Sequence, residues 1–158
     1  MSAKARFLNK LQQQQLSRHG FANRGQADIA EFCQRMNVLM KQMEEWLMQT
    51  GIRIESHAIS LSECLIGGEV FSVSEIGLRY QNRIITFTPV FLYAQGVTGG
   101  VDVTLCADGK MVPLRRLFMR SAGNVKTWTS IPAGKPASVR TAFTEEAFFE
   151  TIECLLSE

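Results

Sequence analysis

The feature that most constrains the fold is a change of apolar period at Gly51. Between Ile29 and Leu47, large apolar side chains recur at steps of three and four residues, which places them along one face of an α-helix. Beyond Gly51, apolar side chains alternate with polar ones, a spacing that is typical of strands with one buried face. The sequence therefore predicts a long amphipathic helix over about residues 27–49, followed by a sheet that covers its apolar face.

The remaining pattern predicts a meander sheet and a C-terminal helix. Residues 52–131 contain five or six strand-like segments joined by short polar or glycine-rich turns, and short turns join antiparallel neighbours. A helix is predicted over residues 145–156, with Thr144 as its N-cap, because the hydroxyl can accept from a free backbone amide. Helices at both ends and a five- or six-stranded antiparallel sheet between them define a single α+β domain over residues 1–158.

The N-terminal segment is basic throughout. The first 27 residues carry five basic side chains and no acidic one. Residues 3–18 are predicted to form a helix, which a glycine-containing break at residues 19–25 separates from the long helix. Phe7, Leu8 and Leu11 mark one face of this predicted helix. Because the other helices are acidic, we expect this helix to dock within the chain. An acidic partner, nucleic acid and a membrane surface are the alternatives.

Cysteine usage and apolar content favour a cytoplasmic protein. No apolar stretch approaches the roughly 20 residues of a membrane span, and the N-terminus shows no signal-peptide pattern. The four cysteines lie far apart in apolar segments, where a reduced thiol packs as a small hydrophobic group. No C-x-x-C spacing occurs, so the sequence predicts neither a zinc site nor a redox motif. We expect no bound metal and no cofactor.

No catalytic motif is recognised, and we expect no catalytic residue. Histidine is the commonest general base, and the chain contains only two histidines. The glycine-rich segments match neither a phosphate-binding loop nor a dinucleotide-binding fingerprint. An enzyme with an unfamiliar site near His57 is therefore the third hypothesis, behind two kinds of binding protein.

The strand region holds a group of basic residues beside aromatic ones, an arrangement on which nucleic-acid bases can stack. The candidate partner-binding residues are Arg115, Arg116, Arg120, Lys126 and Trp128. Within one strand, Arg115 is expected to face away from Arg116 and Arg120, because strand side chains alternate. Basic side chains on edge strands also prevent aggregation. A nucleic-acid-binding regulator that uses this basic sheet region is therefore the alternative hypothesis.

The leading hypothesis is a non-catalytic cytoplasmic binding protein, of the adaptor, chaperone or inhibitor type, that acts through protein–protein contacts. The long helix is a second candidate surface, for a homodimer or another partner. The residues concerned are Met36, Met40, Met43 and Trp46. Burial of this stripe on the chain's own sheet is the favoured interpretation, because the stripe is wider and less regular than a coiled-coil seam.

Overall fold

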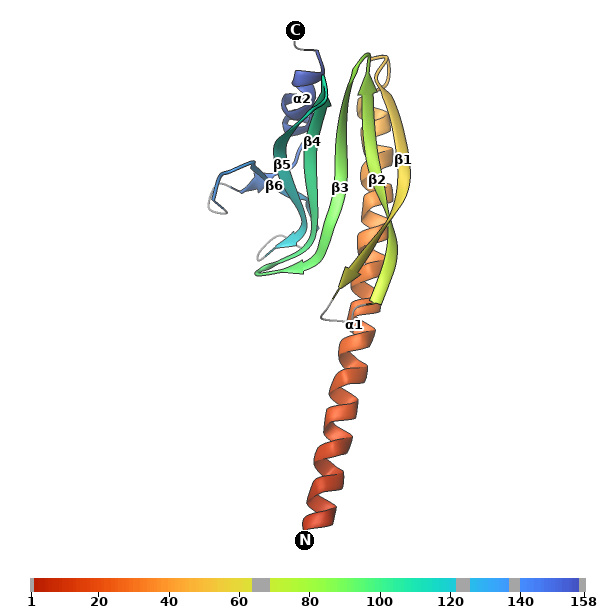
Figure 1. The fold of residues 1–158 in the computed structure, drawn as a ribbon, viewed down its shortest axis with the longest axis vertical. Helices are drawn as coiled ribbons and strands as arrows, with labels where there is room; N and C mark the ends of the chain where they lie inside the picture. Colours follow the sequence, from red (N-terminus) through yellow and green to blue (C-terminus); the bar gives the residue numbers. More distant parts are fainter. Residues whose placement is uncertain (1, 64–68, 122–125, 137–139, 157–158) are drawn as a thin grey trace.

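The structure, a computed structural model, describes residues 2–63, 69–121, 126–136 and 140–156, and only the backbone of residues 13–24 and 69. The chain forms a long helix, a seven-stranded antiparallel sheet and a short C-terminal helix (Figure 1). The predicted α+β class is confirmed, with seven strands in place of the five or six expected.

The helix α1 spans Ala3–Trp46, and α2 spans Glu145–Ile152, followed by the 3-10 helix η3 over Glu153–Leu155. The strands are β1 (Arg53–Glu63), β2 (Glu69–Tyr80), β3 (Arg83–Ala94), β4 (Val97–Ala107), β5 (Lys110–Ser121), β6 (Thr129–Pro132) and β7 (Thr141–Ala142). Their order in the sheet follows their order in the chain, and each pairs antiparallel with the next, so the predicted meander is confirmed. The two-residue β7 is too short to show a periodic pattern.

The helices expected at residues 3–18 and 27–49 are joined into one helix of 44 residues. Gly20 and Gly25, which suggested a break, lie inside it. A glycine costs about 1 kcal/mol relative to alanine in a helix, but extending a helix that has already formed is favourable. No proline interrupts the segment. Among the described residues, no helix is both long enough and apolar enough to cross a membrane.

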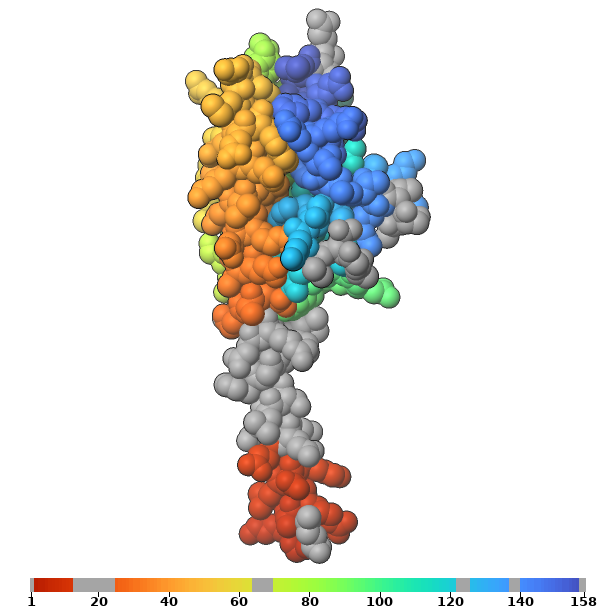
Figure 2. Space-filling model, turned by 180° about the vertical axis from the view of Figure 1, so that it is seen from behind, coloured from red at the N-terminus to blue at the C-terminus, as the bar shows by residue number. Residues whose placement is uncertain are grey.

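The second half of α1 and the shorter α2 cover the same face of the sheet, and they lie side by side when the molecule is viewed from behind (Figure 2). The core is formed where these two helices meet the sheet. Its largest fully buried side chains are Phe32, Met36, Leu39, Met43, Ile76, Leu78, Ile85, Phe87, Leu92, Leu117, Met119 and Phe148. The apolar stripe that the sequence shows on the long helix is therefore buried in the domain's own core.

The sheet divides between β2 and β3. These strands pair only between Ile76 and Tyr80 of β2 and the start of β3, whereas β1 and β2 pair without interruption along their whole length. Ile76 and Leu78 are buried in the half that pairs with β3, and Phe71 and Val73 in the other half. Because residues of odd and even number face opposite sides of a strand, the β1–β2 hairpin turns its other face inward and packs on α1.

The C-terminal helix begins where the sequence predicts. The Thr144 hydroxyl accepts a hydrogen bond from the amide of Ala147 at 3.2 Å, which caps the first turn. The rings of Phe143 and Phe148 lie on either side of this cap with their centroids 6.4 Å apart, an apolar contact that fixes the direction in which the chain enters the helix. The predicted helix is thus confirmed, with a last turn of 3-10 type.

Candidate functional site

The first part of α1 projects away from the sheet and from α2 (Figure 1), and the opposite view shows its first turns standing clear of the body (Figure 2). Residues 2–12, which we call the projecting helix, are all exposed. Its large apolar side chains are Phe7, Leu8 and Leu11, which are 65%, 51% and 41% exposed. Its charged side chains are Lys4, Arg6 and Lys10. The projecting helix therefore presents an apolar surface within a purely cationic one.

The expectation that this basic helix docks on an acidic helix of its own chain is wrong. The acidic α2 lies at the end of the molecule opposite the N-terminus (Figure 1), and continuity of α1 keeps the projecting helix from folding back. The helix start is nevertheless well specified, because the Ser2 hydroxyl accepts from the amide of Ala5 at 3.2 Å. A formed helix that shows large apolar side chains to solvent is typical of an interaction surface.

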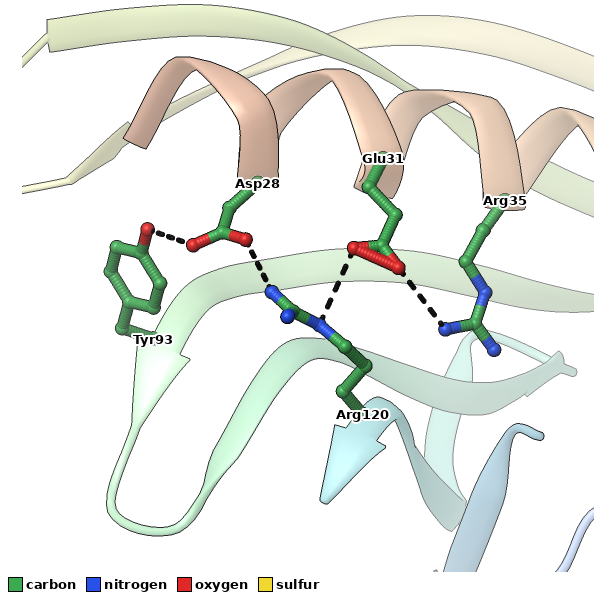
Figure 3. A network of polar contacts seen from close by, with 5 residues as sticks. All are labelled: Asp28, Glu31, Arg35, Tyr93 and Arg120. Atoms are coloured by element: carbon green, nitrogen blue, oxygen red, sulfur yellow. Dashed lines mark hydrogen bonds and ion pairs between the residues drawn. The ribbon is translucent and has the colours of Figure 1, made fainter. Parts of the chain in front are cut away.

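A network of charged side chains holds α1 on the sheet near the point where the helix leaves the body (Figure 3). Asp28 on α1 accepts hydrogen bonds from the Tyr93 hydroxyl of β3 and from the Arg120 guanidinium of β5. Glu31, one turn further along, lies 3.4 Å from Nε of Arg120 and 3.8 Å from Nη1 of Arg35. The side chains of Asp28 and Arg120 are only 20% and 29% exposed, so their contact is less screened than a surface ion pair.

This network joins one helix to two strands, and it therefore fixes the direction of α1 relative to the sheet. Arg35 adds an aromatic contact, because its guanidinium lies over the ring of Trp128, 5.4 Å from the ring centroid. The projecting helix continues the same helix toward the N-terminus. Its direction is therefore set by Asp28 and Glu31, more than four helical turns away from the exposed residues themselves.

The Tyr93 hydroxyl makes the network sensitive to alkaline pH. Burial, and then the hydrogen bond to Asp28, raises the pKa of Tyr93 above its usual value of 10.0. The folded protein therefore holds the phenolic proton more tightly than the unfolded chain does. The resulting stabilisation is complete below about pH 10 and is lost as the pH rises toward the pKa of the folded protein.

We expect Tyr93→Phe to lower the free energy of unfolding by about 1 kcal/mol at pH 7, because Asp28 loses a donor at a partly exposed site. Urea denaturation of both proteins between neutral pH and about pH 11 should show the difference shrinking above about pH 10, where only the wild-type unfolded chain gains from ionisation of Tyr93. A difference that stays constant over this range would show that the Tyr93 proton is not coupled to folding.

The five residues predicted to form a partner-binding surface are not gathered into one exposed surface. Arg120 belongs to the network under α1, and Trp128, with only 8% of its surface exposed, lies under the guanidinium of Arg35, which belongs to the same network. Lys126 is exposed. Arg115 and Arg116 line a hollow together with residues of β4, of β6 and of the segment that follows β6. Charge and aromatic content selected these residues in the sequence, but the fold gives them separate roles.

The four residues of the predicted helix surface contribute to the core. Met36 and Met43 are fully buried, and Met40 and Trp46 are partly buried against the same core. The indole of Trp46 packs on the ring of Phe148, with centroids 5.0 Å apart. Met36 and Met43 are therefore not accessible to a partner helix, and homodimerisation of the chain stays a prediction.

Among the described residues, the interaction found for His57 is with a carboxylate and not with a cysteine thiol. His57 lies on β1 with a side chain that is 63% exposed, and its Nε2 is 3.9 Å from Glu55 Oε1. Burial raises the pKa of the Cys33 and Cys154 thiols, which disfavours the reactive thiolate. Cys64 lies outside the described residues. Within those residues, no three His, Cys, Asp or Glu side chains gather into a metal-binding group.

Comparison of the chain with protein-family models, curated proteins and solved structures found no match. Function has therefore to be inferred from the molecule itself. The feature that stands out is the projecting helix, because it combines exposed large apolar side chains with a single sign of charge, and because a network of contacts fixes its direction.

Proposed function

We propose that the protein is a non-catalytic binding protein that holds a partner protein through the projecting helix. The observation that carries this proposal is the exposure of Phe7, Leu8 and Leu11 on a formed helix. Phe7 and Leu11 lie one turn apart and therefore share one face. Apolar anchors at this spacing are how amphipathic helices bind in the apolar grooves of other proteins. In the complex, the projecting helix would be the helix that binds in the groove of the partner.

The charge of the projecting helix indicates what surrounds the groove of the partner. The basic side chains of residues 2–12 face no acidic side chain of the same segment. A partner with acidic residues at the rim of an apolar groove would gain complementary contacts and a faster, salt-dependent association. The partner is therefore an acidic protein surface with an apolar centre.

The continuity of α1 makes such binding more favourable. A free helix shorter than about 12–15 residues is only marginally stable in water, and ordering it on binding would weaken the complex. Here the projecting helix extends a helix whose other half is packed on the sheet. Its conformational entropy has therefore been lost before the partner arrives, which favours a rigid adaptor or inhibitor over a flexible tail.

Free thiols favour a cytoplasmic location, and ion pairs within the basic sheet region favour a protein partner over nucleic acid. The cysteines that the structure describes are free thiols, and free thiols persist in reducing compartments. In the basic sheet region, Arg116 is paired with Asp102 and Arg120 with Asp28. These ion pairs reduce the positive charge that phosphate groups would meet.

The double variant Phe7→Ser/Leu11→Ser tests the proposal. Affinity purification from the cells that naturally express the protein, followed by mass spectrometry, should recover a partner with wild type and lose it with this variant. The free energy of unfolding should change by less than about 0.5 kcal/mol, because both side chains are solvent-exposed. A loss of binding therefore reports on the surface and not on the fold.

Met48→Ser is the matched control. Met48 is 71% exposed in the turn that follows α1, so this variant removes a comparable apolar side chain from the body of the protein. It should recover the same partner as wild type. Recovery of the same proteins by the double variant would rule out the projecting helix as the binding surface.

A further inference from the structure

The C-terminal helix turns an acidic surface with apolar side chains toward solvent. Residues 145–156, from the start of α2 to the residue after η3, carry four acidic side chains and no basic one. All four carboxylates are exposed, and among the described residues none of them is paired with a cation. Phe149 and Leu156 are also exposed, at 37% and 63%. We call this surface the acidic face, and it consists of Glu145, Glu146, Phe149, Glu150, Glu153 and Leu156.

The spacing of the acidic face surrounds an apolar side chain with carboxylates. Glu146 precedes Phe149 by three residues and Glu153 follows it by four, so both are its neighbours on the helix surface. Leu156 follows Glu153 by three residues, which is one turn of a 3-10 helix. The opposite side of the same segment is buried in the core. The acidic face is therefore the side of the helix that the domain itself leaves uncovered.

The acidic face has the properties required of the partner of the projecting helix, namely acidic residues around apolar ones. The projecting helix cannot reach the acidic face of its own chain, because the two surfaces lie at opposite ends of the molecule and α1 is continuous (Figure 1). Two projecting helices would repel each other, since their only charged side chains are Lys4, Arg6 and Lys10. The complementary surface of a second copy is therefore its acidic face and not its projecting helix.

We propose that the partner of the projecting helix is a second copy of this chain, whose acidic face it contacts. The inference rests on the function proposed above and names the partner. Phe7 and Leu11 would lie against Phe149, and the cations beside them would meet the carboxylates around it. Each copy carries one surface of each kind, so the contact joins copies head to tail. Such contacts form a closed assembly where the rotation between copies allows it, and otherwise continue as an open chain.

Reversing the charge of each surface in turn tests the inference. The first variant has an acidic projecting helix, through Lys4→Glu, Arg6→Glu and Lys10→Glu. The second has a basic C-terminal helix, through Glu146→Lys, Glu150→Lys and Glu153→Lys. In each variant the two surfaces carry the same sign of charge. Self-association of either variant alone should therefore be at least about a hundredfold weaker than that of wild type.

Mixing the two variants should restore association. In an equimolar mixture, the acidic helix of the first variant meets the basic surface of the second, and the two unchanged surfaces also complement each other. The affinity should return to within about tenfold of that of wild type. Sedimentation velocity of the purified full chain measures all four samples at low salt, and circular dichroism checks that both variants are folded. Added sodium chloride should weaken the association of wild type.

Substitution of one exposed apolar side chain provides a test that does not depend on the charge variants. Leu156→Ser should weaken self-association about tenfold, since it removes an apolar contact of the acidic face. Val70→Ser is the matched control, because Val70 is 64% exposed at the start of β2 and outside both surfaces. Its self-association should equal that of wild type.

The inference would be overturned if wild type stayed monomeric up to about 100 µM at low salt, a concentration at which even weak complexes form. Undiminished association of either folded charge variant alone would also overturn it, as would a mixture that stays monomeric or a Leu156→Ser protein that associates like wild type. The proposed function would survive each of these results if affinity purification recovered a different protein that Phe7→Ser/Leu11→Ser loses.

Discussion

Replacing Phe148 with alanine is expected to lower the free energy of unfolding by about 3–5 kcal/mol. The ring is fully buried where three parts of the molecule meet. Its centroid lies 5.0 Å from that of Trp46 on α1, 6.5 Å from that of Phe87 on β3 and 6.4 Å from that of Phe143, which precedes α2. Removing the ring leaves a cavity bordered by both helices and the sheet, and a cavity with rigid walls on all sides cannot collapse to recover the lost contacts.

The neighbouring Phe149 provides the control. It lies on the same helix but is 37% exposed, so Phe149→Ala should cost no more than about 1 kcal/mol. Urea denaturation followed by tryptophan fluorescence measures both variants, and Trp46 reports directly on the environment of Phe148. Equal losses from the two substitutions would show that α2 does not pack on the sheet through the face described here.

The parts of the fold that the sequence predicts correctly are those that depend on local spacing. The stripe from Ile29 to Leu47 repeats at helical intervals, and every fully buried side chain that the structure describes on α1 belongs to it. The meander follows from short turns between alternating segments, because short turns leave antiparallel pairing as the only solution. The cap at Thr144 is also a local signal, and its hydrogen bond to the amide of Ala147 is present.

The continuity of α1 could not be predicted in the same way. Gly20 and Gly25 each weaken a helix locally, but whether the helix survives them depends on how firmly its other half is packed. That packing involves strands that follow much later in the chain. The error about the break at residues 19–25 led directly to the error about internal docking, because only an interrupted helix could have folded back onto the domain.

The separation of the basic residues also depends on contacts that are distant in the sequence. Arg120 meets Asp28 across 92 residues, and Tyr93 meets the same carboxylate across 65. Nothing in the local sequence of β5 distinguishes Arg120, which is part of the network, from Arg115, which lines the hollow. The bulge at Leu114 is equally hidden, because it becomes visible only when the register with β4 is known.

Gly99→Ala is expected to lower the free energy of unfolding by about 2–5 kcal/mol, from two causes that add. Gly99 has a φ of +75°, a left-handed conformation that an alanine adopts only at a cost of about 1–2 kcal/mol. A methyl group there would also lie 2.7 Å from Cβ of Met119 and 3.1 Å from the ring of Phe32. The first of these atoms is attached to the backbone of β5 and cannot move without the strand, so overpacking adds about 1–3 kcal/mol.

Gly96→Ala separates the two causes, because Gly96 has a φ of +77° and no atom within 4 Å of the position of the added methyl group. Its free energy of unfolding should fall only by the cost of the left-handed backbone conformation, about 1–2 kcal/mol. The difference between the two variants in urea denaturation then measures the cost of fitting a methyl group between Met119 of β5 and Phe32 of α1. Equal losses would mean that both neighbours give way at no cost, and that close packing does not require a glycine at this position.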